Sequence, residues 1–326
     1  MNLGLDIGSI SVKLAALTDD GSIRFVSYAR SAGAPLTALR AGLKELQEQT
    51  GCTTFDRVVA TGSGKTLIST LPGVASTSEI LAHATAVATL CPGARTVIEI
   101  GGQDSKIIIL REGVAVDFAM NTVCAAGTGA FLDQQAGRLS IGIESVGDLA
   151  MASRAPVRIA GRCTVFAESD MIHKQQMGHR VEDILYGLCQ AMARNYLNNV
   201  GLGKEIREVV AFQGGVAFNQ GMIRAFEEAL NLPVKVPPHH EVMGAIGAAM
   251  LAREAVSALG QPSRFKGFGI SELDYRTTSF ECQHCSNHCE IVQVSVGKRV
   301  VARWGGRCER WEVTEATAET VEAVGV

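Results

Sequence analysis

The sequence is poor in aromatic residues, shows little excess of either charge and contains no long apolar run. Aromatic residues make up 5% of its 326 residues, whereas glycine occurs 35 times. This balance favours strands and helices joined by tight turns, where glycine lets two backbone segments approach closely. No apolar run approaches the ~20 residues that a membrane span needs. A net charge of −3 lacks the basic footprint of a nucleic-acid-binding protein.

A secretory signal is also missing from the start of the sequence, which enters a predicted strand at Asn2. We therefore expect a cytoplasmic protein with neither a membrane nor a nucleic acid as partner. Disulfides are rare in that compartment, so nine cysteines favour metal or redox chemistry for some of them. Six cysteines and histidines lack ligand spacing and are predicted to be structural or ordinary polar residues: Cys52, Cys91, Cys189, His83, His173 and His179.

The first informative turn lies between predicted strands at residues 2–7 and 11–17. Backbone N–H groups in a turn of small residues can approach a phosphate, assisted by hydroxyl groups and a lysine. An aspartate at the end of the first strand would hold Mg²⁺ through water. Asp6 is therefore a candidate catalytic residue, and the candidate nucleotide contacts here are Gly8, Ser9, Ser11 and Lys13. Taken alone, the same pattern also fits an ordinary hairpin turn.

The same order of strand, glycine-rich turn with an acid, and strand recurs after residues 96–100, where the turn contains Gly101 and Gly102. Two such turns predict two similar halves that face each other across a nucleotide cleft. In the second turn, Asp104 is expected to hold the metal-bound water or to activate the attacking water. Gln103 is expected to position that water.

A third glycine-rich strand end contains Gly214, Gly215 and Ala217, and a later helix of very small residues contains Gly244. Small residues let a flat adenine lie close to the helix, but they equally allow tight helix packing. A segment at residues 61–66 looks like a P-loop, but the motif requires glycine at position 59, where this chain has valine. We interpret that segment as a connecting loop.

Two cysteines stand just before predicted helix starts. Cys124 precedes a run of small residues and a helix that reaches about Arg138, and Cys163 precedes a second helix-like segment. The positive end of a helix favours a thiolate, which suits a ligand of a metal cluster. Each cysteine alone also fits a buried structural residue. The nucleotide-site pattern around the two cysteines favours the metal ligand.

Together these motifs resemble the ATPase superfamily of actin, sugar kinases and heat-shock chaperones. More narrowly, they resemble the ATPase activators of 2-hydroxyacyl-CoA dehydratases, a family that includes the ATPase subunits of benzoyl-CoA reductase. The resemblance covers residues 1 to about 255 and rests on these stretches: Leu5 to Ser9, Ile100 to Lys106, Cys124 to Gly129, Thr164 to Asp170, Gly214 to Ala217 and Gly244 to Ala249.

The resemblance implies a duplicated actin-like (ribonuclease-H-like) α/β fold with two lobes around a nucleotide cleft. The first lobe would span residues 1–110, completed by about 236–256, and the second would span 111–235. The resemblance further implies a homodimer that shares one [4Fe–4S] cluster, held by Cys124 and Cys163 of each protomer. ATP hydrolysis would then drive one low-potential electron, received from a ferredoxin or flavodoxin, onto an iron–sulfur dehydratase or reductase that acts on an acyl-CoA.

The last part of the chain, residues 261–326, has a different character. Its cysteines follow a C-x₂-C-x₃-C pattern with a fourth cysteine 19 positions later: Cys282, Cys285, Cys289 and Cys308. Four thiolates at this spacing predict a metal site on a hairpin, either zinc or a second [4Fe–4S] cluster. Its role, as electron entry or as a structural staple, is open.

Two other functions compete with the activator hypothesis. A small-molecule kinase of the same superfamily would transfer a phosphoryl group and need no iron. A non-catalytic iron–sulfur redox sensor would bind nucleotide without hydrolysing it, so steady ATP hydrolysis separates it from the activator.

Overall fold

The computed structural model describes residues 1–65, 68, 73–121, 124–259, 265, 275–297, 299–306 and 308–311. The chain divides into two compact units, Met1–Ser78 with Ala248–Val326 and Glu79–Gly247. Among the described residues, no helix combines the length and apolar character needed to cross a membrane.

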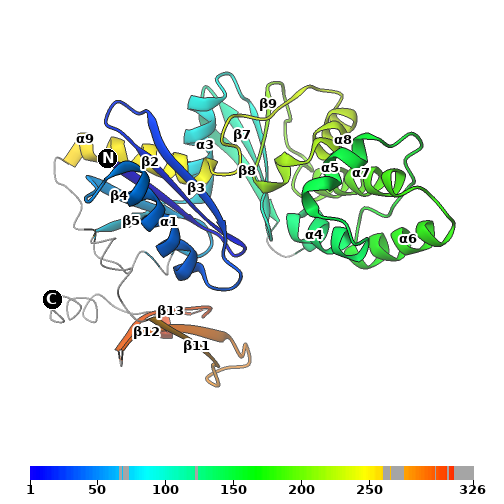
Figure 1. Cartoon of the computed structure of the whole chain (residues 1–326). Coiled ribbons are helices and arrows are strands. Elements are labelled where there is room, and N and C mark those ends of the chain that lie inside the picture. The colour runs from blue at the N-terminus through cyan, green and yellow to red at the C-terminus, as the bar shows by residue number, and fades with distance from the viewer. Residues whose placement is uncertain are drawn as a thin grey trace. The chain divides into compact units, whose positions relative to one another are not determined.

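The first unit is built on a five-stranded sheet in the order β3-β2-β1-β4-β5. Its strands are β1 (Asn2–Ile7), β2 (Ser11–Leu17), β3 (Ile23–Arg30), β4 (Arg57–Thr61) and β5 (Val74–Ser76). β1 pairs antiparallel with β2 and parallel with β4. Helix α1 (Pro35–Thr50) packs beside β2 (Figure 1), because Leu39, Leu43 and Leu46 lie on one helical face and join the same apolar core as the sheet.

The second unit repeats this topology with a sheet in the order β10-β9-β6-β7-β8. Its strands are β6 (Thr96–Ile100), β7 (Ser105–Arg111), β8 (Val114–Asn121), β9 (Val210–Gln213) and β10 (Val234–Lys235). β6 pairs antiparallel with β7 and parallel with β9, as β1 does with β2 and β4. The duplication expected from the two glycine-rich turns is therefore present. Both β6 and β7 belong to this second sheet, so its first strand starts at residue 96, whereas the sequence placed the lobe boundary at 110.

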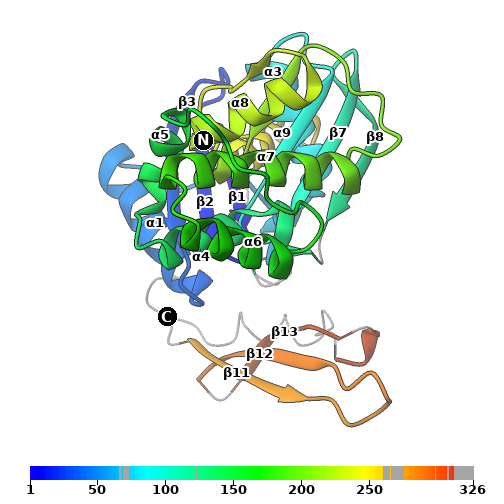
Figure 2. The same ribbon diagram turned by 90° about the vertical axis from the view of Figure 1, so that its right-hand side faces the viewer.

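Helix α7 (Val181–Asn199) forms the centre of the second unit, with Leu188, Cys189 and Tyr196 in its apolar core. Figure 2 shows α4 and α6 beside it. The other helices are α3 (Glu79–Leu90), η1 (Ala125–Gly127), α4 (Gly129–Arg138), α5 (Ile143–Met151), α6 (Thr164–Gln176), η2 (Gly215–Phe218) and α8 (Gln220–Leu230). Helix α9 (Met243–Leu259) begins in this unit and ends in the first.

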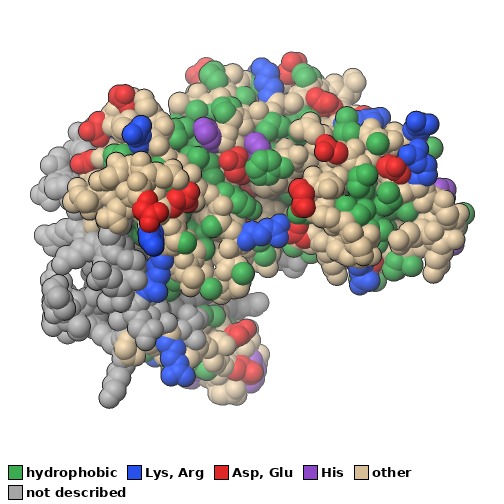
Figure 3. All heavy atoms as spheres, viewed as in Figure 1, with side chains coloured by type: hydrophobic (Ala, Val, Ile, Leu, Met, Phe, Trp, Pro, Cys, Tyr) green, Lys and Arg blue, Asp and Glu red, His purple; other side chains and the backbone are tan. Residues whose placement is uncertain are grey.

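The end of the chain forms a separate antiparallel sheet in the order β11-β12-β13. Its elements are β11 (Tyr275–Glu281), β12 (Glu290–Val296), β13 (Arg299–Trp304) and η3 (Glu309–Trp311). The two later strands match the predicted hairpin, whereas β11 was not predicted, because its Thr-Thr-Ser stretch lacks an apolar alternation. On the face drawn in Figure 3, acidic and basic side chains are interspersed, as the small net charge suggests.

Candidate nucleotide and cysteine site

The first predicted phosphate turn joins β1 to β2. Asp6 and Lys13 are cross-strand partners, and Lys13 Nζ lies 3.0 Å from Asp6 Oδ2. The N–H of Gly8 donates to the carbonyl of Ser11 at 2.9 Å, which closes the turn. Asp6 is 5% exposed, so its paired carboxylate is held in one place at the end of the strand.

The segment interpreted as a connecting loop lies beside this turn. It follows β4, and parallel neighbours such as β1 and β4 end at the same edge of a sheet. Gly62 has a φ of +93°, and a Cβ there would stand 2.6 Å from Asp6 Oδ1. Ser63 Oγ lies 3.3 Å from Ser9 Oγ. The loop therefore borders the predicted phosphate turn, although it fails the P-loop pattern; the parallel pairing of β1 and β4 is the signal that would have placed it there.

The second predicted turn joins β6 to β7 and repeats the acid–lysine pair. Glu99 and Lys106 are cross-strand partners, in the same register as Asp6 and Lys13. Lys106 Nζ also reaches two further carboxylates, so its three distances are 2.7 Å to Glu79, 2.9 Å to Asp104 and 3.1 Å to Glu99.

Lys106 is a buried ammonium group at 2% exposure. Burial by itself lowers the pKa of a lysine, but the charges of Glu99, Asp104 and Glu79 outweigh that effect and raise the pKa of Lys106 above its ordinary value. The group therefore stays charged and fixes three acids around the second turn.

Glu99 was assigned no role from the sequence, and this cluster gives it a defined position. Glu99, rather than Asp104, is the positional equivalent of Asp6, because cross-strand register relates the two strand pairs. Asp104 lies one residue before β7, with one carboxylate oxygen on Lys106, while Gln103 is exposed. The predicted catalytic pair thus stands in the turn itself, next to a buried cation that was not predicted.

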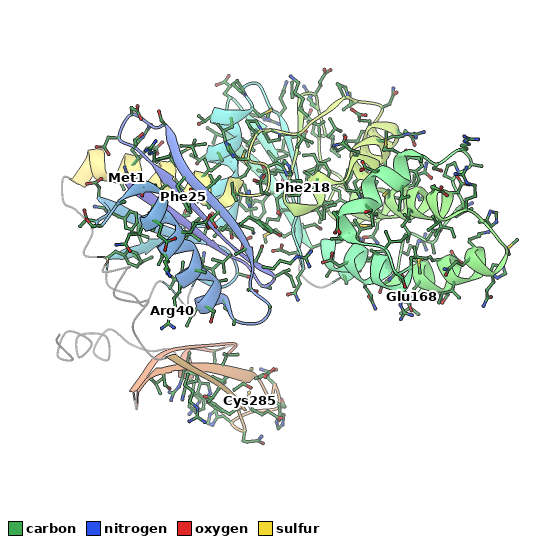
Figure 4. All side chains as sticks on the ribbon, in the orientation of Figure 1. Met1, Phe25, Arg40, Glu168, Phe218 and Cys285 are labelled. Carbon is green, nitrogen blue, oxygen red and sulfur yellow. The ribbon has the colours of Figure 1, made fainter. Side chains whose placement is uncertain are left out.

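The third glycine-rich strand end packs against the second turn. Gly214 has a φ of +89°, and a Cβ there would stand 2.3 Å from the carbonyl oxygen of Ile100. Only glycine permits both this backbone conformation and this approach. The predicted contacts Gly215 and Ala217 follow in η2, whose last residue, Phe218, is exposed (Figure 4).

Helix α9, which carries the predicted contact Gly244, packs closely against α3. A Cβ on Gly247 would stand 1.8 Å from the carbonyl oxygen of Ala82, so the small residues of α9 serve tight packing at this position. In the same region, His83 Nδ1 lies 2.7 Å from Gln213 Nε2, as expected for a satisfied polar histidine. An adenine contact at Gly244 stays a prediction.

Both predicted cluster cysteines precede helical turns in the second unit and are free, partly exposed thiols. Cys163 is the N-cap residue of α6, as expected. Cys124 is the N-cap residue of the short helix η1, and α4 begins only at Gly129. The expected helix therefore follows Cys163 directly, whereas one 3₁₀ turn separates Cys124 from α4. Residues 122 and 123 lie outside the described residues.

The backbone of Cys124 is held from both sides by one amide side chain. Asn121 Nδ2 donates to the carbonyl of Cys124 at 2.7 Å, and Asn121 Oδ1 accepts from the N–H of Cys124 at 2.9 Å. These bonds hold the peptide groups on either side of the Cys124 Cα, so its Cα–Cβ direction is set by the end of β8.

The helix after Cys124 is bonded to the second phosphate turn. The N–H of Gly129 donates to the carbonyl of Gly101 at 2.9 Å, and the N–H of Ala130 donates to the carbonyl of Gly102 at 2.8 Å. The first N–H groups of a helix have no partner within the helix. Here the turn supplies those partners, so the predicted phosphate-binding and cysteine segments are joined by their backbones.

The tail cysteines lie on and after the connection between β11 and β12, where Figure 4 labels Cys285. The N–H of Cys282 donates to the carbonyl of Cys289 at 2.8 Å, and Trp311 Nε1 lies 3.2 Å from Cys282 Sγ. The bond from Trp311 lowers the pKa of the Cys282 thiol, as does the backbone N–H of His284. In the part of the chain that the structure describes, no three His, Cys, Asp or Glu side chains gather as a metal site, so the four tail cysteines are not brought together.

Comparison with known proteins agrees with these features. The sequence profile of the BadF/BadG/BcrA/BcrD ATPase family matches residues 3–252. The chain is 35% identical to a 2-hydroxyisocaproyl-CoA dehydratase activator of Clostridioides difficile, over 77% of this chain and 94% of that protein. It is 35% identical to the (R)-2-hydroxyglutaryl-CoA dehydratase activating ATPase of Acidaminococcus fermentans, over 77% of this chain and 96% of that protein.

A solved structure has the same fold over the same part of the chain. It is the activator of the 2-hydroxyisocaproyl-CoA dehydratase from Clostridium difficile with bound ADPNP, with a TM-score of 0.73, 33% identity, and coverage of 79% of this chain and 96% of that one. The fold is thus the actin-like, duplicated α/β ATPase fold that the motifs predicted. This chain belongs to the BadF/BadG/BcrA/BcrD ATPase family.

Proposed function

We propose that this protein is an ATP-hydrolysing activator that passes single low-potential electrons to a 2-hydroxyacyl-CoA dehydratase or a related acyl-CoA reductase. The observation that carries the proposal is the pair of backbone hydrogen bonds from Gly129 and Ala130 to the Gly101–Gly102 turn. They give a change at a bound phosphate a direct path to the segment that begins at Cys124. Related proteins that are named activators of such dehydratases support the same assignment.

The residues around Cys124 and Cys163 suit a cluster shared by two copies of the chain. A single protomer offers two thiols here, and a [4Fe–4S] cluster takes four. Val165 and Phe166 lie just after Cys163 in the first turn of α6. Both are apolar and exposed, at 66% and 64%, as expected of residues that a second copy covers. When bound, the cluster would supply a one-electron store, filled by a ferredoxin or flavodoxin.

The nucleotide residues act by positioning and charge. Asp6, paired with Lys13, would hold Mg²⁺ through water, and the turn at Gly8 to Ser11 would receive a phosphate. In the second turn, Asp104 would orient the attacking water with Gln103. Release of the phosphate would free the Gly101–Gly102 turn to move, and the helix bonded to it would move with it.

The test combines metal analysis with one matched pair of cysteine variants. Protein purified without oxygen should be a dimer in which the Cys124–Cys163 site accounts for about two irons per protomer, equal to one shared four-iron cluster, in addition to any metal held by the tail. Cys124→Ser should lose this iron and ATP-dependent electron transfer. Cys91→Ser, which changes a buried cysteine outside the site, should keep both. A monomer with no iron after reconstitution, or a Cys124→Ser protein that transfers electrons normally, would refute the proposal; phosphoryl transfer to an acceptor by such a monomer would identify a kinase.

A further inference from the structure

A single buried amide on α7 lies between the two cysteine-bearing loops. Asn195 is 2% exposed, and its Nδ2 donates to the carbonyl of Gly161 at 2.6 Å, two residues before Cys163. The same nitrogen lies 3.4 Å from the carbonyl of Arg162. One side chain therefore bonds to the two peptide groups that lead directly into Cys163.

The other end of the same amide faces the Cys124 loop. Asn195 Oδ1 lies 3.1 Å from the place where a Cβ on Gly127 would stand, and it accepts from Asn199 Nδ2 at 3.0 Å. Asn121, which holds the backbone of Cys124, borders the same place at 3.9 Å. The Cys124 loop thus closes against Asn195, and a Cβ at residue 127 would press on that side chain.

The second loop is also fitted to α7 by its backbone. A Cβ on Gly161 would stand 2.9 Å from the carbonyl oxygen of Ala191, one helical turn before Asn195. Arg194 Nη2 donates to the carbonyl of Ile159 at 2.9 Å. Helix α7 is therefore the common support of both loops, and Asn195 is the residue on it that reaches both.

We infer that Asn195 is a positioning residue that fixes the separation of Cys124 and Cys163 within a protomer, so that both thiolates suit one cluster. The inference rests on the proposed function for the identity of the metal group, but not for the geometry. Removing an outer hydrogen-bond partner of metal ligands lowers metal affinity by about 10- to 100-fold. Loss of the Asn195 contacts is expected to act in this way on both cysteines together.

The first test uses Asn195→Asp, which keeps the size of the side chain but replaces the Nδ2 donor with an acceptor facing the Gly161 carbonyl. A chelator should strip iron from this variant faster than from the unmodified protein, by up to the about 10- to 100-fold by which loss of a supporting partner lowers metal affinity. The low-temperature spectrum of the reduced cluster should also change, while basal ATP hydrolysis stays unchanged. The matched control is Asn198→Ala on the exposed side of the same helix, which should lose iron at the original rate.

The second test needs no metal. In metal-free protein, hydrogen–deuterium exchange should rise in both peptides, the one with Cys124 and the one with Cys163, on Asn195→Ala, which removes both ends of the amide. Gly127→Ala crowds Asn195 from the other loop and should raise exchange in the Cys163 peptide too, so it serves if the alanine variant does not fold. Exchange that rises in one peptide alone, or iron loss at the original rate, overturns the inference. Unmodified protein that takes up no iron refutes the proposed function, while the exchange result still decides the role of Asn195.

Discussion

One added methyl group tests the two hydrogen bonds that join α4 to the Gly101–Gly102 turn. In Gly129→Ala, the new Cβ would stand 3.0 Å from the carbonyl oxygen of Gly101 and 3.2 Å from Val216 Cγ2. The first contact is with backbone, which cannot rotate away. The helix start must therefore shift from the turn and weaken the bonds from Gly129 and Ala130.

The size of the effect follows from two opposing contributions. Two backbone hydrogen bonds stabilise the protein by about 1 kcal/mol each. Replacing glycine by alanine within a helix raises the free energy of unfolding by about 0.5–1 kcal/mol. We expect Gly129→Ala to lower the free energy of unfolding by about 1–1.5 kcal/mol. Gly137→Ala is the matched control, because it lies in the same helix with nothing within 4 Å of its Cβ, and it should raise that free energy by about 0.5–1 kcal/mol.

The coupling between the bound nucleotide and the Cys124 segment is measured separately from the stability of the protein. In metal-free protein, the rate of alkylation of Cys124 is compared between a non-hydrolysable ATP analogue and ADP. A loss of about 1.4 kcal/mol in coupling free energy reduces the nucleotide-dependent ratio of these rates by about tenfold. Gly137→Ala should keep the original ratio. If Gly129→Ala loses the expected stability but keeps the original ratio of alkylation rates, the nucleotide does not act on Cys124 through the Gly101–Gly102 turn.

Two further predictions concern the buried cation and the tail. Lys106→Met leaves the carboxylates around it without their shared partner, so it should lower the free energy of unfolding in urea by about 3–5 kcal/mol. Because the pKa of Lys106 is raised in the folded protein, its contribution to stability is complete below the unfolded-state pKa of about 10.4 and is lost only above it. If the stability difference between the unmodified protein and Lys106→Met already shrinks from about pH 7 to about pH 9, this reasoning is wrong. In the tail, a metal would have to gather the four cysteines that the structure leaves apart. The prediction from their spacing is either about one zinc or about four extra irons per chain, abolished by Cys289→Ser but not by Cys52→Ser, and a tail without metal in the unmodified protein would refute the site.

Local patterns in the sequence located the elements that carry the site. The predicted strands at residues 2–7 and 11–17 and the predicted helix start after Cys163 agree with the structure. These features depend on the alternation of apolar residues and on turn and cap residues, which act over a few positions along the chain. The family follows from the same short motifs.

The partners that hold the site in place came only from the tertiary structure. Glu99 and Glu79 meet at Lys106, and Asn195 lies 34 positions beyond the carbonyl that it binds. Apolar periodicity indicates which face of an element is buried, but not which distant residue packs against that face, so these contacts are not recorded in any local pattern. The sequence by itself predicted the candidate residues for phosphate and thiol chemistry, because that prediction depends on side-chain types and local turns. Only the tertiary structure decided which buried groups fix them, because those distances arise when separate elements pack together.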